Sequence, residues 1–247
     1  MSAADLVLPS AGPDPIPFDT ALAAVLGYAL GRRPLRFRSP SYPDGKWVQI
    51  RAFGYERFDC HPGTDLSLGE VDILIAEGLH GRLDPERWAV LRDTFHEVRP
   101  TAAAVVERAA GRAFWELPDD EFSLLTEPGT VGALLREVRE QPHAKYVAAA
   151  LHHRHPNLVP LTNGTTWRQL IAHRRESDSG VEAVVHRELT TNKDAFGALE
   201  QAVNAAVDGT RLTRLRLHDV LLWLSGSLRL THAVQLGQAA DEWVTQR

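Results

Sequence analysis

The sequence is poor in the features that mark secreted, zinc-bound or membrane-spanning proteins. Cys60 is the single cysteine among 247 residues, which excludes an internal disulfide and a cysteine-based zinc site and suits a reducing compartment. No stretch approaches the roughly eighteen consecutive apolar residues of a membrane-spanning helix. Residues 1–17 lack the basic start and the apolar core of a signal peptide. We therefore expect a cytoplasmic protein that has no membrane partner.

An overall basic character is also missing, but basic residues are concentrated in one segment. The net charge is −5 and the isoelectric point is near 6.1, unlike the basic balance of a dedicated nucleic-acid binder. Residues 54–130 hold sixteen acids and seven bases, whereas residues 136–175 hold seven Lys and Arg, two acids and five of the eleven histidines. This pattern is typical either of a local positive face or of ordinary solvated helix surfaces. Both interpretations stay open.

Apolar residues recur at helical spacing through most of the chain. Phe18–Leu30 is one clear example, and a helix that begins at Asp84-Pro85 is expected to end at Pro100. We expect an all-α fold of about nine or ten helices, in a single helical domain over residues 18–247. Four prolines predict that residues 1–17 form a flexible arm.

An aromatic-rich insertion at about 33–63 interrupts this helical pattern. Its alternation predicts a small β-hairpin near residues 35–53, with a turn at Tyr42–Gly45. Because an isolated hairpin is only marginally stable, we expect it to pack on the helices. Asp59, Cys60 and His61 follow; since adjacent side chains point in different directions, a loop is the simpler interpretation than a catalytic trio.

The segment Tyr146–Leu161 (YVAAALHHRHPNLVPL) consists of a small-residue helix, a basic turn and two prolines. It resembles a motif of the helix-hairpin-helix DNA-glycosylase-like proteins, in which such a helix precedes Leu-x-x-(Lys/Arg)-x-Pro-x-Leu-x-Pro and then, usually, an aspartate. It is most similar in style to an uncharacterised, mainly actinobacterial helical family, domain of unknown function 6308. Leu215–Ser225 and, more loosely, Thr64–Leu74 also look like segments of that family. The resemblance covers about residues 64–225 and implies a glycosylase-like helical domain.

Several positions depart from the glycosylase pattern. Pro142-His143-Ala144 stands where the family has Gly-hydrophobic-Gly, whose glycines let backbone amides approach a DNA phosphate. Asn163 stands near the expected catalytic aspartate, and Lys145 lies one residue before the position of a nucleophilic lysine. The resemblance therefore implies the scaffold more than the reaction.

Three residues are the candidate catalytic groups: Asp219, His218 and Lys145. His218 and Asp219 interrupt the apolar run Leu215–Leu224, and buried polar groups need partners. The alternative to a catalytic role is a structural one, in which Asp219 caps a helix or pairs with Arg216 or with a basic residue of the 141–175 segment. Asp219 is nevertheless the acid that best fits an enzyme site, because it would face the core beside a histidine.

The candidate substrate-binding residues are Asn163, Trp167, Arg154, Arg168 and His155. Asn163 is either a turn residue in the left-handed region or a residue at the mouth of a pocket. Trp167 is expected to point inward, with base stacking as an alternative. The basic residues around His155 suit an anion or a solvated surface. No carboxylate lies nearby in sequence to complete a metal site, so we expect no metal and no cofactor.

Three functional hypotheses follow. The first is a nucleobase- or nucleic-acid-binding protein on a glycosylase-like scaffold. The second is a cytosolic enzyme that acts on a small molecule, in a remodelled pocket lined by Asn163, Trp167, His218 and Asp219. The third is a non-catalytic interaction protein.

Overall fold

The fold is mainly helical. A computed structural model describes residues 4–61, 68–125, 127–208 and 212–239. These residues contain eleven α-helices, two short 3-10 helices and one antiparallel hairpin, so the all-α prediction with a small β element is confirmed. The helices are α1 (Phe18–Leu30), α2 (Tyr55–Phe58), α3 (Glu70–His80), α4 (Pro85–Ala109), η1 (Phe114–Glu116), η2 (Asp119–Phe122), α5 (Val131–Glu140), α6 (Ala144–Arg154), α7 (Gly164–Ile171), α8 (Glu182–Thr191), α9 (Lys193–Ala206), α10 (Arg214–Gly226) and α11 (Leu230–Gln238).

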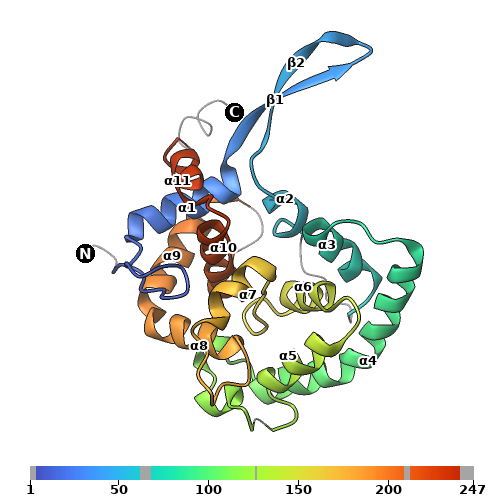
Figure 1. Cartoon of the computed structure of the whole chain (residues 1–247), viewed down its shortest axis with the longest axis vertical. Helices are drawn as coiled ribbons and strands as arrows, with labels where there is room; N and C mark the ends of the chain where they lie inside the picture. The colour runs from blue at the N-terminus through green and yellow to red at the C-terminus, as the bar shows by residue number, and fades with distance from the viewer. Residues whose placement is uncertain (1–3, 62–67, 126, 209–211, 240–247) are drawn as a thin grey trace.

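The helices form two groups that face one another across the middle of the molecule (Figure 1). In one group α1 packs on α9, α10 and α11, so the first and the last described helices lie side by side. In the other group α6 packs on α3, α4 and α5. Helix α7 contacts α10, so the segment after α6 links the two groups. A site between them draws on residues far apart in sequence.

Two glycines permit the closest contact in the first group. Gly27 of α1 and Gly237 of α11 each face the backbone of the other helix, and a Cβ on either would collide with a carbonyl oxygen. Helices approach this closely only where side chains are absent. This contact fixes α11 against α1.

Helix α4 runs through the proline that was expected to end it. The prediction of a break at Pro100 is wrong, because α4 continues from Pro85 to Ala109. Proline removes one backbone hydrogen bond and crowds the preceding turn. Burial of Val98, Ala102 and Val105 on the core holds the helix together across that position.

The hairpin consists of β1 (Arg32–Ser39) and β2 (Tyr42–Arg51) and differs from prediction in two ways. It projects from the helical body instead of packing on it (Figure 1). Its turn lies at Pro40–Ser41, since Ser39 pairs with Tyr42. Residues 43–45, which include Gly45 at φ +83°, instead form an irregularity within the ladder opposite β1.

The described part of the N-terminal segment is irregular but packed, where we expected a flexible arm. Leu6, Leu8 and Ile16 are buried, and Leu6 pairs with Ile16 in an isolated bridge. The side-chain amide of Asn192 accepts a hydrogen bond from the Val7 N–H at 2.7 Å and donates one to the Val7 carbonyl at 2.8 Å. Apolar burial and paired backbone groups offset the turn-forming effect of the prolines.

Among the described residues, none of the helices combines the length and the apolar character that crossing a bilayer requires.

Candidate functional site

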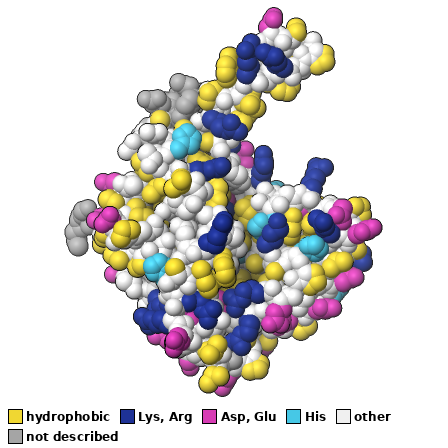
Figure 2. All heavy atoms as spheres, viewed as in Figure 1, with side chains coloured by type: hydrophobic (Ala, Val, Ile, Leu, Met, Phe, Trp, Pro, Cys, Tyr) yellow, Lys and Arg dark blue, Asp and Glu magenta, His cyan; other side chains and the backbone are white. Residues whose placement is uncertain are grey.

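Two pockets, each of about 330 Å³, adjoin Asn163. We name them the Asp219 pocket and the Trp167 pocket. The Asp219 pocket is lined by Tyr28, Gly54, Arg57, Gly78, Leu79, His80, Asn163, Arg216, Asp219, Val220 and Trp223. The Trp167 pocket is lined by Leu135, Val138, Arg139, Ala144, Lys145, Ala148, Pro160, Thr162, Asn163, Gly164, Trp167, Val181 and Glu182. Figure 2 shows Lys and Arg side chains around the hollow in the middle of this face, with Asp and Glu mainly towards its edges.

Arg216 of α10 organises the floor of the Asp219 pocket. Its Nε and Nη2 donate to the two oxygens of Asp59, at 2.6 and 3.0 Å, and its Nη1 donates to Asp219 Oδ2. Nη2 also donates to the Tyr28 hydroxyl at 2.8 Å, which in turn donates to Asp59 at 2.6 Å. Burial opposes the charge of Arg216, but Asp59, Tyr28 and Asp219 raise its pKa well above the ordinary value. A permanently charged guanidinium therefore lies at the centre of this network.

Asp219 is the one member of the network with an unused atom. Its side chain is only 3% exposed, yet Oδ1 accepts no hydrogen bond from the described residues. The Thr166 hydroxyl lies near enough to favour the carboxylate, but it is engaged with the backbone of Asn163. Burial raises the pKa of Asp219, against the opposing effect of Arg216. A buried carboxyl oxygen without a donor is costly, and here it adjoins a cavity that can admit one.

His80 supplies a second unused atom to the same pocket. Its Nε2 is buried and has no hydrogen-bond partner among the described residues. Burial, with a smaller contribution from the charge of Lys145, lowers the pKa of His80 to about 4. The imidazole is therefore neutral at physiological pH and can accept or donate a hydrogen bond according to its tautomer.

Aromatic rings and a close backbone contact shape the remaining walls of the Asp219 pocket. The rings of Tyr28 and Trp223 lie 6.4 Å apart at 71°, and Phe53 packs on both of them. Opposite, Gly78 of α3 faces the carbonyl of Arg57, where any Cβ would collide with it. This contact sets α2 directly against α3, beside the pocket.

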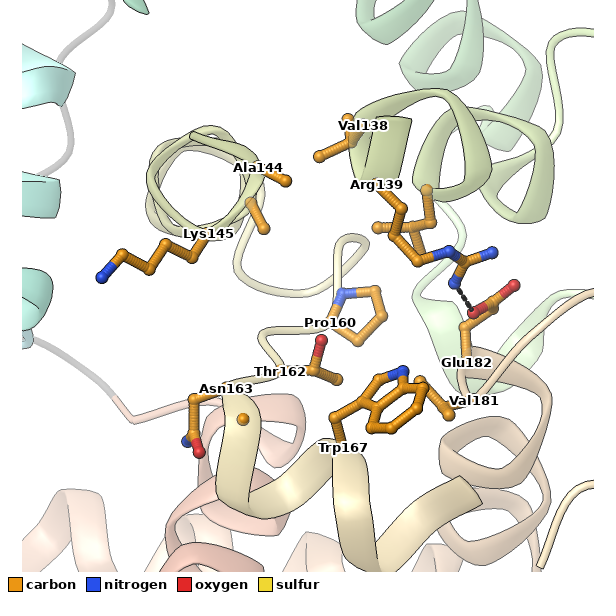
Figure 3. Close-up of a pocket in the computed structure, with 13 residues that line it drawn as sticks. Val138, Arg139, Ala144, Lys145, Pro160, Thr162, Asn163, Trp167, Val181 and Glu182 are labelled. Carbon is orange, nitrogen blue, oxygen red and sulfur yellow. Dashed lines mark hydrogen bonds and ion pairs between the residues drawn. The ribbon is translucent and has the colours of Figure 1, made fainter. Parts of the chain in front are cut away.

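The Trp167 pocket lies between α5, α6, α7 and α8 (Figure 3). Arg139 pairs with the buried Glu182 at 2.7 Å along one wall. Trp167 is 42% exposed, so the expectation that it points inward is wrong; Thr166 is the buried neighbour on α7. Lys145 extends away from Trp167 in this view, and its charge acts instead on His80. Both carboxylate oxygens of Glu182 accept hydrogen bonds, from Ser179 and Arg139, whereas Asp219 has one oxygen that accepts none from the described residues.

Asn163 separates the two pockets and begins α7. Its Oδ1 accepts from the backbone N–H groups of Thr165 and Thr166, at 2.8 and 3.2 Å, as an N-cap. Its backbone is extended, with φ −113°, instead of left-handed. The cap occupies the amide oxygen and leaves the amide nitrogen with no hydrogen bond in the described part of the chain.

His218 lies next to Asp219 in sequence but faces away from the pocket. Its Nε2 lies 2.7 Å from Glu188 Oε2, which also accepts from the Ser10 hydroxyl at 2.7 Å. The second oxygen of Glu188 accepts from the Ser10 backbone N–H at 2.9 Å. Burial opposes ionisation, but the hydrogen bonds from His218 and Ser10 lower the pKa of Glu188. This cluster fastens the N-terminal segment to α8 and α10.

The other predicted binding residues line neither pocket. Arg154 pairs with the buried Asp72 at 2.7 Å and borders a separate depression beside α2. Arg168 is exposed, and its Nε donates to the Gly164 carbonyl of its own helix. His155 is half-buried, and burial lowers its pKa. The structure thus brings together Asp219 and Asn163 in one pocket, and Lys145, Trp167 and Asn163 in the other.

The turn between α5 and α6 differs from a glycine-rich phosphate loop. His143 has φ +57°, the left-handed conformation that glycine adopts most easily. Pro142 before it has no N–H to donate. This turn is therefore poorly suited to hold a phosphate through its backbone amides.

Sequence patterns did not indicate several residues of the Asp219 pocket. Of the alternatives considered for Asp219, pairing with Arg216 is the one that the structure shows. Asp59 lies in the turn after α2, as a loop residue would, but it is buried and paired with Arg216 across 157 positions, which was not predicted. No spacing signal links Tyr28, His80 or Trp223 to α10. Among the described residues, no group of His, Cys, Asp and Glu is arranged to hold a metal ion.

Comparison of the chain with models of protein families, with curated proteins and with solved structures found no match. The glycosylase-like character of the helical domain stays a prediction.

Proposed function

We propose that this protein binds nucleobases, and that the Asp219 pocket receives a base that carries an exocyclic amino group. The observation that carries this proposal is the unpartnered Oδ1 of Asp219, 3% exposed at the wall of a 330 Å³ cavity. A buried acceptor without a donor favours a ligand that brings an N–H group. The pocket lies at the small end of the usual range for ligand sites, roughly 300–1,000 Å³, which suits a small planar ligand.

The walls of the pocket suit the remaining edges and faces of a base. The Tyr28 and Trp223 rings offer apolar surface on which a planar heterocycle can stack. Asn163 and His80 offer polar atoms at further points of the wall. Arg57 is exposed and lines the pocket, so it adds a positive charge that favours a ligand attached to phosphate, whereas the charge of Arg216 is already balanced by Asp59 and Asp219.

The test is a calorimetric titration with adenosine and cytidine, and with purine riboside and uridine, which lack the amino group. We expect the two amino-bearing nucleosides to bind more tightly. Asp219→Asn is expected to weaken adenosine binding roughly 10- to 100-fold, the effect of one hydrogen bond to a charged group of about 1.5–3 kcal/mol. Glu182→Gln is the matched control, since it makes the same acid-to-amide change at a buried residue of the Trp167 pocket.

Unchanged adenosine affinity in Asp219→Asn would contradict the proposal. Equal affinity of the wild-type protein for adenosine and purine riboside would contradict it as well, because the amino group would then have no partner.

An enzyme acting on a small molecule in this pocket is the second candidate. The raised pKa of Asp219, caused by its burial, is the observation that favours it, because acid–base groups in active sites are shifted in this way. Prolonged incubation with nucleosides, followed by chromatography for any product, separates the candidates. A product formed by the wild-type protein but not by Asp219→Asn supports the enzyme; unchanged nucleoside supports binding alone.

A further inference from the structure

The hairpin β1–β2 concentrates positive charge on an acidic protein. Residues 32–51 contain six basic side chains and one acidic one, a net charge of +5, while the whole chain carries −5. The rest of the chain therefore carries −10. The strands project beyond the helical body, so this charge is held apart from the acidic surface (Figures 1 and 2).

Most of these cations are not neutralised by the protein. Arg51 pairs with Glu56 at 2.6 Å, and its Nη1 donates hydrogen bonds to the carbonyls of the last two residues of α1. These contacts fix the base of the hairpin on the helical body. By contrast, the other five have no ion pair among the described residues: Arg32, Arg33, Arg36, which donates to the Asp44 carbonyl, Arg38 and Lys46. Unpaired surface cations in such density favour an anionic partner.

Large apolar side chains are exposed between the cations. Trp47 is 66% exposed, Tyr42 49% and Phe37 48%. The register places Arg36 opposite Trp47 and Phe37 opposite Lys46, so a cation and an aromatic ring lie side by side on each face of the ribbon. Protection of the strand edges from aggregation explains charges and prolines, but it does not explain exposed aromatic rings.

We infer that the hairpin is a binding element for single-stranded nucleic acid. Arginine and lysine contact the phosphates of such a strand, while exposed aromatic rings stack on its unpaired bases. A duplex shields its base faces and would leave the exposed rings without a partner. Unpaired bases therefore fit the alternation of rings and cations better than a double helix does.

The hairpin leads directly into the wall of the Asp219 pocket. The Ala52 N–H donates to the Gly31 carbonyl, Phe53 packs on Tyr28 and Trp223, and Gly54 lines the pocket. A strand held on the hairpin can thus present one base to the pocket. This part of the inference rests on the proposed function, whereas binding by the hairpin itself does not.

The test is fluorescence anisotropy with labelled twelve-residue oligothymidylate and oligouridylate, and with a duplex of the same length, in 50 to 200 mM salt. Thymine and uracil carry no exocyclic amino group, so the result is independent of the amino-group preference proposed for the Asp219 pocket. We expect salt-sensitive binding of the single strands and weaker binding of the duplex. The DNA and RNA arms show which sugar is preferred.

Two variants identify the hairpin as the binding element. The triple change Arg33→Gln, Arg38→Gln and Lys46→Gln is expected to lower the slope of log affinity against log salt by about 2, at roughly 0.7 per lost phosphate contact. Trp47→Ala is expected to weaken binding about 10-fold through lost stacking. The matched control is Arg82→Gln, Arg87→Gln and Arg92→Gln, which removes three exposed charges from the α4 region. Circular dichroism melting checks that each variant is folded.

No binding by the wild-type protein at 50 mM salt would overturn the inference. It would also be overturned by equal affinities of the hairpin and control variants, or by tighter binding of the duplex than of the single strands. Because the nucleoside titration addresses the pocket alone, failure of either proposal can be told from failure of the other.

Discussion

His218 and Asp219 are neighbours on α10, and each belongs to a buried charged cluster, but the two clusters differ in one respect. In the Glu188 cluster both carboxylate oxygens are occupied, by Ser10 and His218. In the Arg216 cluster one oxygen of Asp219 is unoccupied and adjoins a cavity. Burial of charge is common to both, so it does not distinguish a site from a structural contact. What distinguishes a ligand site is a buried polar atom that lacks a hydrogen-bond partner and adjoins a cavity.

The largest loss of stability is expected when the Glu188 cluster, in which both carboxylate oxygens are occupied, is disrupted. Glu188→Ala removes the acceptor of Ser10 and His218 and leaves buried polar groups unpaired, which we expect to cost about 3–5 kcal/mol of unfolding free energy. Urea denaturation followed by circular dichroism measures this cost. A loss below about 1 kcal/mol would mean that the cluster does not fasten the N-terminal segment.

Acidification is expected to act on the two clusters in opposite directions. Folding lowers the pKa of Glu188, so its stabilising contribution is present above the ordinary value of 4.5 and is lost as the pH falls through the folded value. Folding raises the pKa of Asp219, so its contribution favours the folded state below the ordinary value of 3.8 and is lost as the pH rises through the folded value. His152 lies outside both clusters, and burial lowers its pKa to about 4. It therefore adds a loss of about 3 kcal/mol of unfolding free energy as the pH falls from 6.5 to 4, in the wild type and in the variants alike.

Unfolding free energies measured from pH 7 to pH 3.5 test these signs. We expect Glu188→Gln to lose less stability on acidification than the wild type, and Asp219→Asn to lose more. The same slope in both variants would remove the electrostatic distinction between the clusters.

The smallest effect on stability is expected at Asp219 itself. Asn keeps an oxygen for Arg216 Nη1 and removes a buried charge, so Asp219→Asn should change the unfolding free energy by less than about 1 kcal/mol. Thermal melting at neutral pH measures it. A large loss would show that the carboxylate is structural, like Glu188, and would weaken the comparison.

Features that depend on local sequence were predicted well. Helix α1 occupies the predicted stretch Phe18–Leu30 and ends at the predicted glycine, because the apolar period and the glycine are both local signals; its start follows Pro17 and has no cap from Asp19 or Thr20. The pairing of Arg216 with Asp219 is likewise local, at a spacing of three on one helix. The hairpin was predicted, but its projection away from the helices and the continuity of α4 through Pro100 were not, since each depends on packing that no local pattern records.

The pocket could be predicted only in part for the same reason. Asp219 and Asn163 were identified as candidates and line it together, but its other polar groups come from distant segments. Behind the pocket, Asp59 reaches Arg216 from the turn after α2, across 157 positions. In the neighbouring cluster, Ser10 reaches Glu188 across 178 positions. Adjacent helical residues diverge by about 100°, which explains why His218 and Asp219 separate, yet the partners that each one meets are set by tertiary structure.

The role of Asp219 is tested most directly by following the amide chemical shifts of the protein during titration with adenosine. If the unpaired oxygen of Asp219 marks the site, the amides of Gly54, Gly78 and Asn163 shift on titration and those of Ser10 and Glu188 do not. In Asp219→Asn the same shifts are expected to need roughly 10- to 100-fold more adenosine. Shifts centred on the Glu188 cluster, or shifts that persist unchanged in Asp219→Asn, would contradict this role.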